Sequence, residues 1–230
     1  MMLVDEREDG NDRRVEMEMI LINKRGRKRI RQVLSYSKDY GKDSKTIMIF
    51  QKPADVKGTG FLSWEYDDDS KDDDRWLYMP ALKKVRRISG SSGNDYFMGS
   101  DFTYDDMGGR NPDEDTHTLL REENLNEQLC WVIESIPKEK DNMYAKKIVW
   151  IRQDVKMAVK IEYYDKLGLM KTLTISNIKQ VDGIWAAHEM FMDNKAEKHQ
   201  TSLKFNKISY NQDLEDNMFT VSAIERGRLK

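Results

Sequence analysis

Val15-Glu16-Met17-Glu18-Met19-Ile20-Leu21 is the stretch that decides the fold, because its apolar and charged residues alternate. A period of two places successive side chains on opposite faces of a strand, so that one face is apolar and the other faces water. The alternation recurs at Val155–Tyr163 and around Leu203 and Phe205. These segments are rich in Val, Ile, Tyr and Phe, which strands favour. The sequence therefore predicts a mainly β protein.

The same pattern, followed along the chain, predicts a series of strands. They are expected at residues 13–22, 28–37, 44–51, 59–66, 74–79, 83–89, 117–124, 127–135, 146–153, 157–164, 168–176, 177–181, 184–193 and 198–210. Turn signals such as Lys24-Arg25-Gly26 and Val181-Asp182-Gly183 separate many of them. Short turns join antiparallel neighbours, whereas parallel units need an intervening helix, and no such helical pattern occurs. We expect an antiparallel meander.

Two regions break the alternation. Residues 91–110 are rich in Gly, Asp and aromatic residues, and they predict an irregular loop with a short helical turn near Thr103–Met107. Residues 213–225 predict one or two short helices. No linker divides the chain, so we expect a single domain over residues 1–230.

Composition excludes several classes of protein. The 230 residues carry 39 Lys and Arg against 41 Asp and Glu, so the chain as a whole is neither a strongly basic nucleic-acid binder nor an acidic disordered protein. A single cysteine, Cys130, allows no intrachain disulfide and no cysteine-based zinc site. No apolar run is long enough to span a membrane. The first residues, Met1–Glu6, lack the basic and apolar regions of a signal peptide, so we expect either a cytosolic protein or a mature chain without its leader.

An alternating sheet of this size has one apolar face that must be covered, and the sequence offers little helix to cover it. The sheet is expected either to close as a barrel or to leave part of its apolar face as a cavity, with a filled core as the alternative. The abundant methionines suit an adaptable apolar surface. The candidate cavity residues are Met17, Met19, Leu21, Trp76, Tyr78, Trp131, Ile133, Val159, Ile161, Tyr163, Met190, Met192, Leu203 and Phe205.

Charged clusters and motifs give no catalytic or metal site. Basic runs at residues 25–31 and 83–87 would suit phosphate groups, but the water-facing side of a strand is the interpretation we favour. The aspartates of residues 67–74 could bind calcium, but a solvated hairpin tip is favoured. His188-Glu189 lacks the second histidine of a zinc protease motif. We therefore predict no catalytic residue, no cofactor, no metal ligand and no nucleic-acid partner.

The segments Asp74–Ile88 (DRWLYMPALKKVRRI) and Phe97–Asp106 (FMGSDFTYDD) closely resemble the signature of the bacterial outer-membrane lipoprotein-sorting protein family, relatives of LolA and LolB. The resemblance covers nearly the whole chain. It implies a strongly curved antiparallel half-barrel with a few short helices against its concave face and a hydrophobic cavity between them. Members of this family normally have a signal peptide and an N-terminal helix before the first strand, and this chain is expected to lack both.

The resemblance also implies a function. A LolA-like protein is a periplasmic carrier that holds the acyl chains of lipoproteins or another hydrophobic cargo. It would be neither an enzyme nor a membrane-spanning protein. Its relatives accompany inner-membrane transporters of the RND/MMPL type, which implies such a partner. The alternative is a structural or accessory subunit of an exporter of this type, without cargo of its own.

Phe97, Met98, Phe102 and Tyr104 place four large apolar or amphipathic side chains in eight residues of the predicted loop. A solvated loop does not need them, so we expect them to cover the concave face of the sheet. The segment would act as a gate, with Phe102 buried and with Ser100 or Asp101 capping a short helical turn. The alternative is an ordinary part of the core.

Overall fold

The computed structural model describes residues 1–68, 71–89, 92–139 and 142–227, and these form one antiparallel sheet of 13 strands. The strands are β1 (Asp12–Ile22), β2 (Lys28–Tyr40), β3 (Asp43–Lys52), β4 (Gly60–Glu65), β5 (Asp74–Met79), β6 (Lys84–Ile88), β7 (Asp115–Leu125), β8 (Gln128–Pro137), β9 (Lys146–Arg152), β10 (Met157–Asp165), β11 (Gly168–Val181), β12 (Ile184–Asn194) and β13 (His199–Tyr210). The fold class predicted from the sequence is confirmed.

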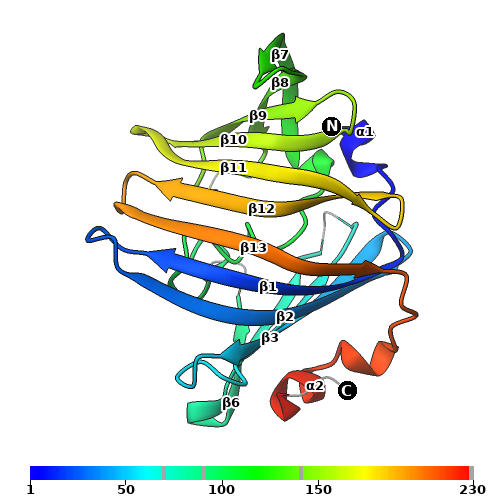
Figure 1. Ribbon diagram of the computed structural model, residues 1–230, viewed down its shortest axis with the longest axis vertical. Helices are drawn as coiled ribbons and strands as arrows, with labels where there is room; N and C mark the ends of the chain where they lie inside the picture. Colours follow the sequence, from blue (N-terminus) through cyan, green and yellow to red (C-terminus); the bar gives the residue numbers. More distant parts are fainter. Residues whose placement is uncertain (69–70, 90–91, 140–141, 228–230) are drawn as a thin grey trace.

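The strand order is β6-β5-β4-β3-β2-β1-β13-β12-β11-β10-β9-β8-β7, so the first and last strands are neighbours in the middle of the sheet. Every other pair joins strands that are consecutive in the chain. β6 and β7 form the two edges, and the sheet does not close into a barrel. Figure 1 shows the curved sheet extending from β6 to β7.

Each predicted strand has a counterpart, with one difference. Residues 168–176 and 177–181 form the single strand β11, and the pairing with β12 continues past their boundary. Asn177 at this boundary has a φ of 55°. Asparagine adopts the left-handed region more readily than most residues, so the strand contains it without ending there.

The segment between β6 and β7, of which the structure describes residue 89 and residues 92–114, has to pass from one edge of the sheet to the other. Figure 1 shows it crossing behind the strands, on what we call the inner face. This face carries the main apolar cluster, in which Met19 and Leu203 of the sheet lie with Phe97 and Phe102 of the crossing segment. The 3₁₀ helices η3 (Phe97–Gly99) and η4 (Pro112–Glu114) lie within its described part.

Short helices cover parts of both faces. Val4 of α1 (Met2–Asp5) and the preceding Met1 pack in an apolar cluster with Val149 and Ile151, which continues the inner face toward β8. α2 (Val221–Arg226) covers the other face of β3 and β4, called the outer face. It follows η5 (Asp216–Met218), and these two helices confirm the helical prediction for residues 213–225.

α2 is needed on the outer face because β3 is apolar on both sides: all four residues from Ile47 to Phe50 are buried. Thr220 caps the helix by accepting a hydrogen bond from the amide of Ala223, and Gly227 ends it with a φ of 61°. η1 (Pro80–Leu82) joins β5 to β6. Among the described residues no helix has the length and apolar character needed to cross a membrane.

Candidate functional site

The candidate site is the inner apolar face together with the segment that covers it. Met17, Met19 and Leu21 of β1 form its centre, since alternate residues of this strand face inward. Met192 of β12 and Leu203 of β13 continue the surface, and all five side chains are buried. This is the surface that the sequence alternation predicts.

Residues 97–106, the plug segment, lie on this face. Phe97 is fully buried, and Phe102 and Tyr104 are 3% and 7% exposed. The ring of Phe97 lies 5.2 Å from the ring of Phe61 and 5.5 Å from that of Tyr104, both in edge-to-face arrangements. Such pairs contribute about 0.5–1.5 kcal/mol beyond the burial of their area. The aromatic rings therefore fill the space beneath β3 and β4.

A tight turn shapes the plug segment. The amide of Phe97 donates to the carbonyl of Phe102 over 2.7 Å, which folds the chain back on itself. Met98 and Gly99 within this turn have φ values of 50° and 72°. The left-handed region suits glycine, so Gly99 fits this position.

The sequence predicted that Ser100 or Asp101 caps the helical turn near Thr103–Met107, and this prediction is wrong. Thr103 caps the turn, because its hydroxyl accepts from the amide of Asp106 while the Asp106 carboxylate accepts from the amide of Thr103. Ser100 bonds instead to the backbone of Phe102, and Asp101 bonds to the sheet.

Asp101 provides the first polar anchor between the plug segment and the sheet. Its carboxylate accepts a hydrogen bond from the hydroxyl of Thr201 on β13 over 2.6 Å, and the backbone amide of Asp101 donates to the same hydroxyl over 2.9 Å. Nδ1 of His199 lies 2.7 Å from the same carboxylate. Asp101 and Thr201 are both buried, so water is largely excluded from these bonds.

Lys171 of β11 provides the second anchor. Its ammonium group is 2.7 Å from the carboxylate of Asp106 and 2.8 Å from the carbonyl of Asp101. The hydroxyl of Tyr144 also donates to Asp106, over 2.9 Å. The Lys171 side chain is 0% exposed, and this burial lowers its pKa, although Asp106 opposes the shift. Burial, followed by the nearby Asp106 charge, raises the pKa of Tyr144 above its usual range.

Arginines provide two further anchors. Arg75 of β5 forms ion pairs with Asp105 of the plug segment and with Asp73, the latter over 2.9 Å. Arg31 of β2 donates to the carbonyl of Met98 over 2.6 Å. The plug segment is thus fastened by polar groups from strands on both sides of the central pair, and its apolar side chains lie on the sheet between them.

The structure brings together nine of the predicted cavity residues. Met17, Met19, Leu21, Tyr163, Met192 and Leu203 are buried in the inner cluster, and Ile161, Met190 and Phe205 pack against it while partly exposed. Trp131 and Ile133 lie with α1 in the adjoining cluster, to which Ile161 also belongs.

Three of the predicted residues lie on the outer face. Trp76 and Tyr78 pack with the cluster under α2, because they alternate with the inward-facing Leu77. The pairing of β10 with β9 shifts by one residue between Ala158 and Lys160, which turns Val159 to the face opposite Ile161. Val159 therefore packs with Trp150.

The polar anchors were not predicted from the sequence, yet a signal for them exists. Each of three anchors stands two positions before an inward leucine: Arg75 before Leu77, Lys171 before Leu173 and Thr201 before Leu203. A charged or polar residue in phase with an apolar face has to find a buried partner.

Three of the hollows in the described part of the chain are partly open to solvent, and two of them are lined in part by Tyr144 or Phe50 of the inner cluster. One of about 410 Å³ lies between the β1–β2 and β12–β13 turns, one of about 500 Å³ is lined by Tyr144 and Leu167, and one of about 620 Å³ lies between Gly58 and the end of α2. All three include charged residues in their lining. The inner apolar face is filled by the plug segment.

The aspartate-rich turn has structural partners. Asp73 pairs with Arg75 and Asp74 with Arg87, while residues 69 and 70 lie outside the described residues. Among the residues that the structure describes, no three His, Cys, Asp or Glu side chains are grouped as a metal site would need.

Comparisons with known proteins agree with this architecture. The chain is 36% identical to a domain from Vibrio parahaemolyticus assigned to outer membrane lipoprotein sorting, with 98% of this chain and 96% of that chain covered and a TM-score of 0.92. It is 34% identical to a DUF1329 family protein from Desulfovibrio piger, with 97% and 95% covered and a TM-score of 0.92. A LolA superfamily protein from Nitrosomonas europaea, 19% identical, shares the fold with a TM-score of 0.74 over 95% and 94% of the two chains.

A family profile described as an uncharacterized protein matches residues 42–226. A comparison with curated proteins gave no match. The two identities above 30%, each over nearly the full length of both chains, establish the family. The chain belongs to the outer-membrane lipoprotein-sorting protein family and has its LolA-like fold.

Proposed function

We propose that this protein is a non-enzymatic carrier in the bacterial periplasm, which holds lipoprotein acyl chains or another hydrophobic cargo against its inner face. The observation that supports the proposal is the way in which the inner face is covered. Phe97 and Phe102 fill it from a crossing segment that belongs to neither edge strand and is fastened largely by polar side chains. The lipoprotein-sorting relative supports the choice of cargo.

Cargo would bind by replacing the plug. An acyl chain that takes the place of Phe97 and Phe102 gains about 0.8 kcal/mol for each buried CH₂ group. The anchoring charges, among them Asp106 and Lys171, become hydrated when the segment leaves, which offsets part of the lost ion pairing. The segment can then leave at a lower cost than a wholly apolar cover would require.

Release requires a partner, because burial of a long chain is slow to reverse. A membrane protein of the RND/MMPL type, as implied by the family resemblance, is the partner that we propose. A second candidate function is favoured by the filled inner face itself: an accessory subunit of such an exporter, with no cargo of its own.

The test combines native mass spectrometry with a fluorescent fatty-acyl probe. We expect lipid to be retained by protein purified gently from its host, and the probe to bind. Phe97→Ala with Phe102→Ala should leave the sheet intact by circular dichroism and speed the exchange of the plug for the probe by at least about tenfold, because the plug then has less apolar area to hold it in place.

Phe219→Ala is the matched control, since Phe219 is equally buried but lies in the outer cluster. It should lower stability by about 3–5 kcal/mol and leave probe exchange unchanged. If the plug variant only loses stability while exchange stays as in the parent, the segment is ordinary core. A protein that retains no lipid and binds no probe would favour the accessory subunit.

A further inference from the structure

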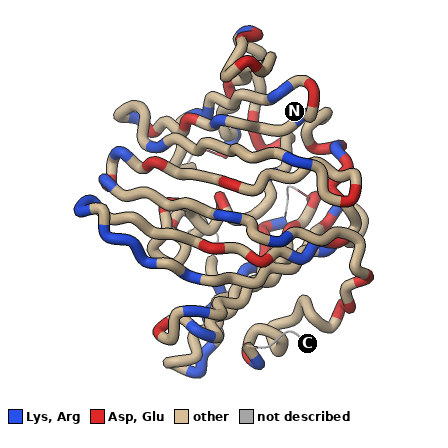
Figure 2. The backbone as a smooth tube through the Cα atoms, viewed as in Figure 1, with Lys and Arg blue, Asp and Glu red and all other residues tan. Residues whose placement is uncertain are grey.

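One end of the molecule is unusually basic. Six of the eight residues from Lys24 to Arg31 are Lys or Arg, and they form the turn between β1 and β2 and the start of β2. The β12–β13 turn beside them adds Lys195 and Lys198. Figure 2 shows these cations at the same ends of the strands, although the whole chain has a net charge of −2.

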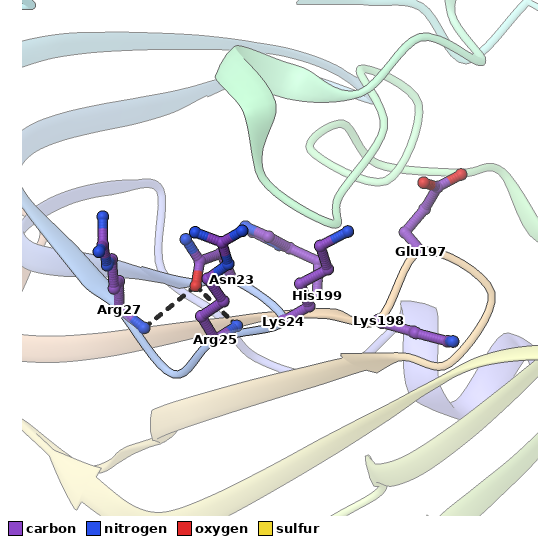
Figure 3. Close-up of a pocket in the computed structure, with 7 residues that line it drawn as sticks. All are labelled: Asn23, Lys24, Arg25, Arg27, Glu197, Lys198 and His199. Carbon is purple, nitrogen blue, oxygen red and sulfur yellow. Dashed lines mark hydrogen bonds between the residues drawn. The ribbon is translucent and has the colours of Figure 1, made fainter.

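The two turns enclose the hollow of about 410 Å³, shown in Figure 3. Its lining is Asn23, Lys24, Arg25, Arg27, Glu197, Lys198 and His199. Four of these side chains are cations against one carboxylate, that of Glu197, and Figure 3 shows this carboxylate on the far side from the β1–β2 turn. No ion pair engages the four cations within the described part of the chain, so an outside anion would not have to displace an internal partner.

The β1–β2 turn is ordered before any ligand binds. Oδ1 of Asn23 accepts hydrogen bonds from the amides of Arg25 and Arg27, over 2.9 and 3.1 Å. On the other wall, Nδ1 of His199 contacts the Asp101 carboxylate, which leaves Nε2 as the ring nitrogen not engaged in the anchor. This wall of the hollow is therefore joined to the plug segment.

We propose that this hollow binds the phosphate groups of anionic phospholipids and so docks this end of the protein on a membrane surface. Lys24, Arg25, Arg27 and Lys198 are all exposed, as are Lys28 and Arg29 beyond the rim. An exposed array of this kind suits a flat layer of phosphates, whereas a site for a free phosphate ion would enclose its ligand among buried donors.

The lining offers little surface for base stacking. No aromatic side chain other than His199 lines the hollow, whereas single-stranded nucleic acid is bound by basic grooves with aromatic platforms. A lipid phosphate accordingly fits these residues better than RNA does. Docking does not depend on the carrier proposal, because it concerns an end of the molecule that can be tested without cargo.

The test is sedimentation of the full chain with phosphatidylcholine vesicles that contain or lack phosphatidylglycerol, at moderate salt. We expect binding only to the anionic vesicles, with weaker binding as salt is added. Lys24→Glu with Lys198→Glu should lower the binding constant by at least about tenfold, because each basic residue near an anionic surface raises that constant severalfold.

Lys84→Glu with Arg86→Glu is the matched control, since it changes the net charge equally at the exposed cations of β6. It should reduce vesicle binding by less than about twofold if the hollow is the site. Circular dichroism confirms that both variants are folded. Equal losses for the two variants would overturn the proposal, as would the absence of binding to anionic vesicles.

Two further measurements identify the source of the phosphate. Inorganic phosphate, titrated calorimetrically, should bind too weakly to compete with vesicles at millimolar concentration. Competition at that level, or tighter binding of a labelled uridine oligonucleotide than of anionic vesicles, would overturn the assignment to a lipid surface.

Discussion

At the scale of single residues, inward polar side chains distinguish this sheet from a plain apolar one. Lys171 is 0% exposed, and its partner Asp106 lies 65 positions away in the sequence. Alternation could predict the apolar faces, because it depends on neighbouring residues only. It could not predict which distant carboxylate would meet this lysine, since that depends on how residues 92–114 cross the sheet.

Lys171→Met should destabilise the protein by about 3–5 kcal/mol, because it leaves the carboxylate of Asp106 buried without its cation. Urea unfolding measures the change. Lys204→Met, at an exposed position of β13, is the control and should change stability by no more than about 0.5 kcal/mol. Adding Asp106→Asn to Lys171→Met should recover part of the loss. A similar, small effect of both lysine substitutions would argue against a stabilising role for the buried pair.

At the scale of elements, the sequence predicted the strands well and their covering less well. Period-two alternation located nearly every strand, and the aromatic residues of 97–104 indicated a segment that would be buried. The predicted position of α2 was wrong: the short helices were expected against the concave, inner face, but α2 lies on the outer face because β3 is apolar on both sides. The bulge that turns Val159 outward was also missed, since a one-residue shift leaves no mark in the composition.

The packing around Gly60 shows how closely α2 approaches the sheet. A Cβ atom at this position would lie 2.8 Å from Cβ of Ile224, which is too close. Gly60→Ala should therefore cost about 1–3 kcal/mol through overpacking. It should also change the fluorescence of Trp64, whose indole N–H donates to the carbonyl of Phe219 just before α2.

Ile224→Gly removes the clashing Cβ and Cγ2 atoms and provides the control. Within that variant, Gly60→Ala should cost clearly less than it does in the parent, as measured by a double-mutant cycle on urea unfolding. Additive effects of the two substitutions would mean that the contact between Gly60 and α2 is not the reason for a glycine there.

At the scale of the whole molecule, charge is divided between the two ends of the strands. The end opposite the basic hollow carries several carboxylates, and Figure 2 shows acidic residues near both the N-terminal segment and the chain after β13. Although the Asp39 side chain is exposed, protein atoms around it displace part of its water, and this desolvation, together with the nearby Asp9, raises the pKa of Asp39 to about 6. An acid with a raised pKa in the folded state destabilises the fold once it is ionised, so its cost develops as the pH rises from about 4 to above 6.

Asp39→Asn should accordingly raise the melting temperature at pH 7 and have little effect at about pH 2.5, where the carboxyl is protonated in both folded and unfolded states. Thermal unfolding at the two pH values measures the difference. Asp182→Asn, an exposed carboxylate in the β11–β12 turn, is the control for loss of one charge. Equal gains for Asp39→Asn at both pH values would contradict the electrostatic explanation.

The pairing of β1 with β13 has a consequence for biosynthesis. Local hairpins can build the two arms, β1 to β6 and β7 to β13, as the chain emerges, because each step joins consecutive strands. The seam between the arms needs the last strand of the chain, after nearly two hundred residues have been made. Until then, one edge of β1 is unpaired, and Met17 and Met19 lack their neighbours Phe205 and Leu203 on β13. The pairing of β1 with β13, at the centre of the sheet, is therefore the last pairing that the emerging chain can complete.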